Sequence, residues 1–309
     1  MTAVAQAAPF TLSPSTASSS LLDGSLLDGS LLDGLDARVF DNYFNRLPFM
    51  IRHNLARHEL FSLPRLIELA QALPADRVEY NSGKIPVSQD PALTPRNGLS
   101  VAETIRRIEE CQSWLVLKNV EHNPAYRALL NACLDEIQPY TEKLAPRMYR
   151  REAYIFISSP GSVTPFHLDN EYNFLLQVRG EKEISQFDRS DRSVISETDL
   201  EKFYTGGHRN LTYKDEYQAK AKVFTLKPGD GLHFPVAAPH WVKNGNAVSI
   251  SFSITFRNPQ SEHREMVYCV NSKLRQYGLS PTPVGISPWR DSLKFNALRG
   301  WRKFADRQG

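Results

Sequence analysis

The residues best suited to chemistry in this chain are two histidines and an aspartate. His167 and Asp169 stand two positions apart in TPFHLDNEYNF, residues 164–174. On a β-strand, residues i and i+2 project from the same face, so both side chains can bind one metal ion. A third ligand has to come from another strand, and His240 in PGDGLHFPVAAPHWV is the candidate. The spacing therefore predicts that His167, Asp169 and His240 form a metal site and are the catalytic residues.

This set of ligands indicates a particular kind of metal chemistry. Two histidines and one carboxylate on one face of an ion leave its other positions open, as in non-haem Fe(II) oxygenases. At such a site a co-substrate, O₂ and a substrate can meet at one metal. A His-x-Asp pair taken alone is also common as a structural feature between strands. The interpretation therefore depends on further matches along the chain.

Composition and charge indicate which kinds of molecule the protein is expected to bind. The chain has 309 residues, of which 41% are hydrophobic and 23% charged, and its net charge is +3. These values are ordinary for a globular protein of one large domain or two small ones. Basic residues alternate with acidic ones, so we expect no nucleic-acid partner. No apolar run approaches the ~18 residues of a membrane span, so we expect no membrane partner.

The cysteines and the first residues bear on the cellular compartment. The three cysteines, Cys111, Cys133 and Cys269, are far apart and include no C-x-x-C pair. They therefore indicate neither a zinc knuckle nor a disulfide framework. The first 20 residues have no basic segment followed by a continuous apolar one, which is unlike a signal peptide. Together these features predict a cytoplasmic protein.

The chain divides into three parts. Residues 1–36 are rich in small and polar residues and contain SLLDG three times in succession, so we expect a disordered tail. A period of five fits neither a helix nor a strand, which favours a tandem duplication, with a docking motif of paired leucines as the alternative. Residues 37–260 are predicted to form the main domain, with a β-core at about 150–257. Residues 261–309 are predicted to be a C-terminal helical extension.

The first part of the main domain is predominantly helical in pattern. Ser100 with Glu103 forms a capping box, and Asn123 before Pro124 is a typical helix start. Apolar spacing and these caps predict helices over residues 62–73, 98–112 and 123–144, with strands near 47–51 and 114–120. After residue 260, helices are predicted over 261–279 and 288–307.

From about residue 150 the pattern changes to short strands separated by turns. The predicted strands are residues 154–158, 174–178, 183–187, 222–226, 231–234 and 248–256. The last of them alternates strictly, with Val248, Ile250 and Phe252 on one face and Ser251 and Ser253 on the other. The hydroxyl face suits either solvent or a polar cavity. This spacing predicts a mainly β fold with flanking helices, in the form of an antiparallel sandwich or barrel.

Two segments carry a family resemblance. The first reads T-P-x-H-x-D and continues with N-F, a glycine and a lysine; here these are Thr164, Pro165, His167, Asp169, Asn173, Phe174, Gly180 and Lys182. The second reads P-G-D-x-L-x-x-P and ends in His240. In these segments the sequence resembles the JmjC and cupin-like 2-oxoglutarate oxygenases. Within that family it resembles the branch of the asparaginyl hydroxylase that inhibits hypoxia-inducible factor.

The resemblance implies a fold, cofactors and residue roles. The fold would be a double-stranded β-helix, the cupin jelly roll, with helical N- and C-terminal additions. The cofactors would be Fe(II) and 2-oxoglutarate, which is the co-substrate. Lys182 and Thr164 would bind the distal carboxylate of 2-oxoglutarate, with Asn173 and Tyr154 near it. Lys182 also has its own physical rationale, because it shares a strand face with Ile184 and a buried lysine is costly unless it meets an anion.

Several points stay open at this stage. Ala237 and Ala238 precede the distal histidine, and serines occupy the final strand, unlike the resembled hydroxylase, so its substrate is not carried over. The substrate is a protein or peptide side chain or a small molecule, and hydroxylation is favoured over demethylation. A cupin-like binding protein without turnover is the alternative. Arg257 is a weaker candidate than Lys182 for 2-oxoglutarate, and His208 and His233 are interpreted as structural. Trp289 and Trp301 predict a homodimer through the C-terminal helices.

Overall fold

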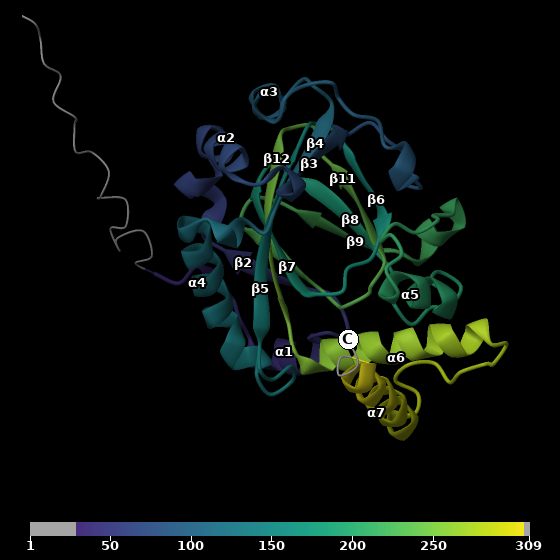
Figure 1. The fold of residues 1–309 in the computed structure, drawn as a ribbon. Helices are drawn as coiled ribbons and strands as arrows, with labels where there is room; N and C mark the ends of the chain where they lie inside the picture. Colours follow the sequence, from purple (N-terminus) through teal and green to yellow (C-terminus); the bar gives the residue numbers. More distant parts are fainter. Residues whose placement is uncertain (1–28, 306–309) are drawn as a thin grey trace, which may run out of the picture.

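The computed structural model describes residues 29–305 and consists of two facing antiparallel β-sheets surrounded by helices (Figure 1). The larger sheet has the strand order β1-β2-β10-β7-β12-β5-β4-β3, and the smaller has the order β6-β11-β8-β9. Many neighbouring strands, such as β10 with β2, β12 with β5 and β11 with β6, come from distant parts of the sequence, as in a jelly roll. The predicted cupin fold with helical additions is confirmed.

The large sheet is built around one long central strand. This strand, β12 (Ser249–Arg257), pairs on one side with β5 (Tyr149–Ser158) and on the other with β7 (Tyr172–Arg179). The remaining strands of this sheet are β1 (Leu32–Asp33), β2 (Phe49–His53), β3 (Val78–Ser82), β4 (Ser113–Lys118) and β10 (Asp230–Phe234).

The small sheet carries two of the predicted metal ligands. Its strands are β6 (Val163–His167), β8 (Lys182–Gln186), β9 (Lys222–Leu226) and β11 (His240–Asn244). Strand β11 lies between β6 and β8, and its first residue, His240, pairs with His167 on one side and with Gln186 on the other. The hydrogen-bonded register of the sheet therefore brings the two histidines together.

Helices lie on more than one side of the two sheets (Figure 1). The helices are α1 (Ala37–Tyr43), α2 (Leu63–Ala72), α3 (Val101–Arg106), α4 (Pro124–Thr141), α5 (Glu197–Tyr204), α6 (Pro259–Gln276) and α7 (Pro288–Ala305). Helices α2 and α4 lie outside the large sheet, whereas α5, α6 and α7 pack beside one another on another side (Figure 1). Asn123 caps α4 as predicted, with its side chain accepting a hydrogen bond from the Ala125 amide, whereas α3 is shorter than the predicted helix. None of the helices within residues 29–305 is long and apolar enough to cross a membrane.

The two faces of β12 have different environments. Its apolar residues, such as Phe252 and Ile254, pack in the main core together with helix residues such as Leu66 and Leu134. Its hydroxyl residues face the other sheet and are buried there: the Ser251 hydroxyl donates to Gln177 at 2.6 Å, and the Ser253 hydroxyl donates to Asn173 at 2.8 Å. Of the two environments that suit the hydroxyl face, the polar interior is the one observed.

The N-terminal boundary of the folded domain differs from the prediction. The first two SLLDG copies lie almost entirely outside the described residues, but the third, Ser30–Gly34, is ordered and includes β1. Leu31 and Leu32 are 7% and 3% exposed and belong to the main core. The prediction of a disordered tail over residues 1–36 is therefore wrong for the third copy, because its two leucines have apolar surface to bury against the domain.

Candidate active site

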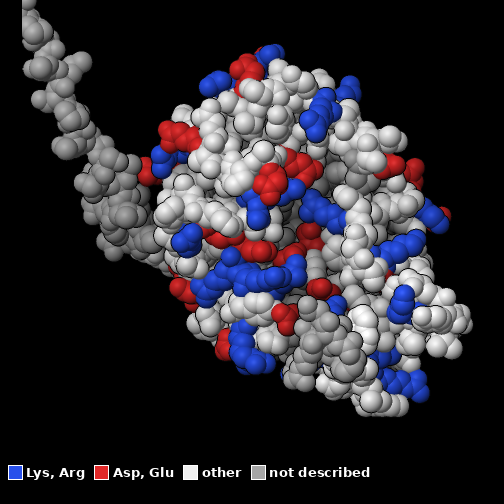
Figure 2. Space-filling view, viewed as in Figure 1, with Lys and Arg blue, Asp and Glu red and all other residues white. Residues whose placement is uncertain are grey.

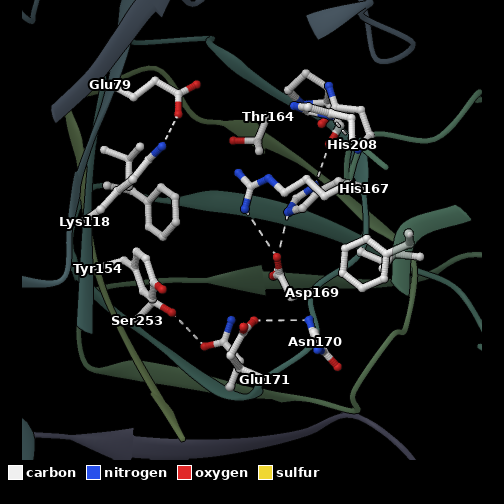
Figure 3. Close-up of a pocket in the computed structure, with 18 of the residues that line it drawn as sticks. Glu79, Lys118, Tyr154, Thr164, His167, Asp169, Asn170, Glu171, His208 and Ser253 are labelled. Atoms are coloured by element: carbon white, nitrogen blue, oxygen red, sulfur yellow. Dashed lines mark hydrogen bonds and ion pairs between the residues drawn. The ribbon is translucent and has the colours of Figure 1, made fainter. Parts of the chain in front are cut away.

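His167, Asp169 and His240 meet at one end of the small sheet, and Figure 3 labels the first two of them. Each offers one ligand atom, and these atoms all lie within 4.8 Å of one another. Oδ2 of Asp169 is 3.9 Å from Nε2 of His167 and 3.7 Å from Nε2 of His240. Both imidazoles are buried, while the Asp169 carboxylate is partly open to a cavity. The structure thus brings together the three residues that the sequence predicted as metal ligands.

The hydrogen bonds of the two imidazoles prepare them for a metal. Nδ1 of His167 bonds the carbonyl oxygen of Pro165 at 2.7 Å, and Nδ1 of His240 bonds that of Ala238 at 3.0 Å. Since a carbonyl only accepts, Nδ1 carries the proton and donates, which leaves the Nε2 lone pair free. Burial lowers the pKa of both imidazoles below the ordinary histidine value, so both are neutral near pH 7. Neutral imidazole is the form that binds a metal ion.

Arg209 forms an ion pair with Asp169, the carboxylate among the three predicted metal ligands. Its guanidinium lies 3.3 Å from Oδ1 of Asp169, the oxygen that does not face the histidines. Backbone bonds hold the Arg209 segment beside β6: the Leu168 amide donates to the Arg209 carbonyl at 3.2 Å, and the Leu211 amide donates to the Phe166 carbonyl at 2.9 Å. Burial alone raises the pKa of Asp169, but His167, Arg209 and His240 outweigh it and keep this carboxyl ionised. Arg209 therefore orients the carboxylate ligand.

We expect Arg209→Gln to weaken divalent metal binding by about tenfold or more, because partners of metal ligands typically contribute 10- to 100-fold in affinity. Titration with Co(II), followed by its visible absorption, measures this directly. Arg96→Gln is the matched control, since Arg96 lines the same cavity and is not among the partners of the three ligands. Tighter metal binding by Arg209→Gln would show that repulsion between the guanidinium and the ion outweighs orientation.

A large open cavity leads to the three ligands. Its volume is about 1230 Å³, and its walls come from both sheets and from the segment after α5. Thr164, Tyr154 and Asn173, which the resemblance associates with 2-oxoglutarate, all line it. The amide oxygen of Asn173 accepts from Ser253, so the Asn173 side chain is held against β12. Figure 2 shows Lys, Arg, Asp and Glu residues mixed around the hollow on this face.

Lys182 lies deeper between the sheets. It is 4% exposed, and burial lowers its pKa to about 7. Among residues 29–305 no carboxylate forms an ion pair with it, and burial is the one influence that acts on its pKa. Its strand neighbours are Asn244 on β11 and Leu226 on β9. A buried amine in such surroundings is costly, and an anion bound beside it would offset that cost. Lys182 is not among the residues that line the cavity.

The other histidines and Arg257 have structural partners. His233 is fully buried: its Nε2 accepts from the Asn45 amide at 3.0 Å, and its Nδ1 donates to the Asn173 carbonyl at 3.1 Å. His208 is exposed at the cavity wall. Arg257 is engaged by Glu171 at 2.5 Å and by Glu265 at 3.7 Å, which agrees with its lower rank as a 2-oxoglutarate residue.

The structure also shows the roles of four residues near the metal ligands that the sequence did not indicate. Ala237 and Ala238 do not line the entrance: both are buried, and the Ala237 amide, at φ 58°, donates to the Asp169 carbonyl at 2.8 Å. They support the ligand segment from behind. The sequence reasoning also missed Arg209 and Glu171 as cavity residues. Glu171 could have been identified from the sequence, because it stands two residues after Asp169. No feature of the sequence indicates that Arg209 lies at the cavity.

Fold and site together define the class: a jelly-roll protein with a His-Asp-His metal site, as in Fe(II)- and 2-oxoglutarate-dependent oxygenases. Residues 135–263 match the family model described as the JmjC domain. The matched stretch includes His167, Asp169 and His240.

Solved structures with a similar fold include that of YcfD from Escherichia coli. The match has 18% identity and a TM-score of 0.51, and covers 87% of this chain and 68% of that one. A second structure, of YcfD as a ribosomal oxygenase in complex with cobalt and 2-oxoglutarate, matches with 17% identity and a TM-score of 0.49, covering 87% and 66%. The chain thus spans about two thirds of the length of these structures. At this identity the likeness concerns the fold alone.

Proposed function

We propose that this protein is an Fe(II)- and 2-oxoglutarate-dependent hydroxylase that acts on a protein or peptide side chain. The observation that carries the proposal is the combination of a three-ligand metal site and a buried, unpaired Lys182 on the same small sheet. The metal ligands alone would suit many metalloproteins. A cation held at a cost deeper between the sheets is useful only to a protein that binds an anionic co-substrate there.

The register of β11 supports this placement of 2-oxoglutarate. His240 pairs with His167, Val242 pairs with Thr164, and Asn244 pairs with Lys182. Four residues along a strand span roughly 13 Å between backbones. The lysine side chain and a five-carbon dicarboxylate can together cover that distance. Lys182 would bind the distal carboxylate, with the Thr164 hydroxyl as a second donor.

Each residue of the site then has a defined task. A bound Fe(II) with 2-oxoglutarate and O₂ would supply the oxidising chemistry, in which one oxygen atom of O₂ enters succinate as CO₂ is lost and the other converts a C–H bond to C–OH. His167, Asp169 and His240 would hold the ion on one face and leave the other face to the cavity. Asn173 and Tyr154 would line the place where co-substrate and substrate meet. No side chain has to act as a general base.

The shape of the cavity favours a side chain of a larger molecule as substrate. At about 1230 Å³ it exceeds the usual volume range of small-molecule pockets, and it is open to solvent. Charged residues of both signs surround it, including Lys118 paired with Glu79 at 2.6 Å. A peptide can contact such a rim through its backbone and charged groups. The description of YcfD as a ribosomal oxygenase is consistent with a protein substrate.

The test is succinate formation by protein purified without oxygen and then supplied with Fe(II), 2-oxoglutarate and O₂. We expect slow uncoupled succinate production, which His167→Ala and Lys182→Ala abolish. A +16 Da product on a cellular protein would establish the substrate class, and a product found only among metabolites would redirect it to small molecules. If 2-oxoglutarate neither turns over nor perturbs the Fe(II) spectrum, the alternative of a binding protein without turnover replaces the proposal.

We further propose that α7 mediates a homodimer. Trp289, Leu293 and Trp301 on this helix are 61–65% exposed, and Trp289 and Leu293 lie one turn apart. Exposed large apolar residues that gather on a surface mark interaction sites. In light scattering we expect the wild-type protein to have twice the chain mass and Trp289→Glu/Leu293→Glu to have the mass of a monomer. A wild-type monomer would contradict the proposal. The cytoplasmic location and the boundary of the domain at 260 stay predictions.

A further inference from the structure

The third SLLDG copy, Ser30–Gly34, binds a defined surface of the folded domain. This surface consists of β2, Asn54 and Glu136 and is called the seat below. Its strand β1 pairs antiparallel with β2, with Leu32 opposite His53 and Asp33 opposite Arg52. The Asn54 amide donates to the Leu31 carbonyl at 2.9 Å. Leu31 and Leu32 are buried in the main core, although they lie at the very start of the described residues. The seat therefore binds this segment through both backbone and side chains.

Glu136 on α4 binds the start of the copy in a way that depends on its sequence. Its carboxylate accepts from the Leu31 amide at 2.8 Å, from the Leu32 amide at 3.0 Å and from the Ser30 hydroxyl at 2.8 Å. Three donors on one carboxylate form a strong, charge-assisted contact. Glu136 thus recognises the Ser30 side chain, whereas the two leucines are recognised through their burial in the core.

Two glycines complete the requirements of the seat. Gly29, just before the copy, has φ 130°, and Gly34, its last residue, has φ 68°, and both values favour glycine. The second copy, Ser25–Gly29, has the same five residues and is also preceded by a glycine, Gly24. The first copy is preceded by Ser19, which fits the first of these conformations poorly.

We propose that the seat accepts the second SLLDG copy as well as the third, so that the N-terminal segment docks in two registers five residues apart. Every contact described above can form in either register, because the sequence from glycine to glycine is identical. The ligand of the seat is therefore the N-terminal segment of the same chain, through either its second or its third SLLDG copy. The first copy is excluded from the seat by the residue before it.

The linker sets the balance between the two registers. With the third copy seated, two residues connect Asp33 to Asp36, the N-cap of α1; with the second copy seated, seven residues connect Asp28 to Asp36. Closing the longer linker disfavours the second register roughly sixfold. Leu35, which packs partly against the core, follows the third copy and adds to this preference. The third copy therefore occupies the seat in most molecules. The second copy binds there when substitutions weaken the binding of the third.

The test compares three variants of the full chain. Leu26→Ser/Leu27→Ser impairs only the second copy, and we expect an unchanged melting temperature. Leu31→Ser/Leu32→Ser impairs only the third copy, and we expect a fall of roughly 3 °C, because the second copy takes its place. The variant with all four substitutions has no competent copy, and we expect a fall at least twice as large. The first of these variants is the matched control for serine substitution.

Hydrogen exchange locates the occupant independently of stability. In Leu31→Ser/Leu32→Ser we expect amide protection at residues 26–27, and the substitutions themselves make the peptides of the two copies distinguishable by mass. Equal melting temperatures for this variant and the fourfold variant, with no protection at 26–27, would overturn the proposal. A melting temperature equal to that of the wild type in all three variants would also overturn the proposal, since the seat would then contribute nothing to stability.

Discussion

His240→Ala abolishes metal binding and, with it, all 2-oxoglutarate turnover: this is the largest effect that we expect of a single substitution. His240 supplies one of three ligands, and it is held by its Nδ1 bond to Ala238 and by its pairing with His167. Two remaining ligands bind a divalent ion too weakly to retain it at micromolar metal. We expect a fall in succinate formation of at least about 1000-fold, since the ion contributes several kcal/mol to such reactions.

His208→Ala is the matched control for this loss. His208 lines the same cavity, but it is exposed and is not part of the three-ligand cluster. Calorimetric titration with Co(II) should show near-normal affinity for His208→Ala and no binding for His240→Ala. Circular dichroism has to show that both variants are folded. If folded His240→Ala bound the metal as the wild type does, the three residues would not be its ligands.

Lys182→Met should eliminate 2-oxoglutarate binding and at the same time stabilise the protein without ligand. The side chain is buried, and the depression of its pKa to about 7 corresponds to several kcal/mol of unfavourable burial for the charged form. Methionine has a similar length and no charge, so it removes this cost. Losing one partner of a buried ion pair costs about 2–5 kcal/mol, so we expect a fall in 2-oxoglutarate affinity of roughly 100-fold or more.

The pH dependence of binding provides the check on this assignment. Only protonated Lys182 attracts a carboxylate, so 2-oxoglutarate affinity of the wild type should fall as the pH rises above about 7. Without ligand the unfolded chain binds the proton more tightly than the folded one, so stability should rise with pH over the same range. Lys182→Arg stays charged and should lose both dependences. A wild-type affinity that is flat from pH 6 to 9 would contradict the role of Lys182.

Much of the site was predictable from short segments. His167 and Asp169 are i and i+2 on one strand face, which is a local property of the chain. The alternation in β12 likewise predicted one apolar and one hydroxyl face, although only packing decided that the hydroxyl face is interior. Lys182 could be singled out because a lysine that shares a face with Ile184 conflicts with burial. Such conflicts between local pattern and environment are typical of functional positions.

Contacts between segments distant in sequence were not predictable in the same way. Arg209 reaches Asp169 only because its loop runs beside β6, and Glu136 meets Ser30 only because α4 lies beside β2 and β1. The prediction of a disordered tail failed over its last copy for this reason. Composition describes the solvation of an isolated segment, but it carries no information on a complementary surface elsewhere in the fold.

The amino-acid sequence alone indicated an antiparallel β sandwich or barrel, the three metal ligands and the candidate cation, since each depends on strand periodicity or on the spacing of residues within a segment. The jelly roll itself was implied by the resemblance of two segments to a known family. The tertiary structure alone decided how these parts meet. It placed His240 opposite His167, gave Asp169 its arginine and seated one of three identical repeats. The physical reason is that strand register and sheet packing are set by the burial of whole faces, a property of the assembled chain and of no single segment.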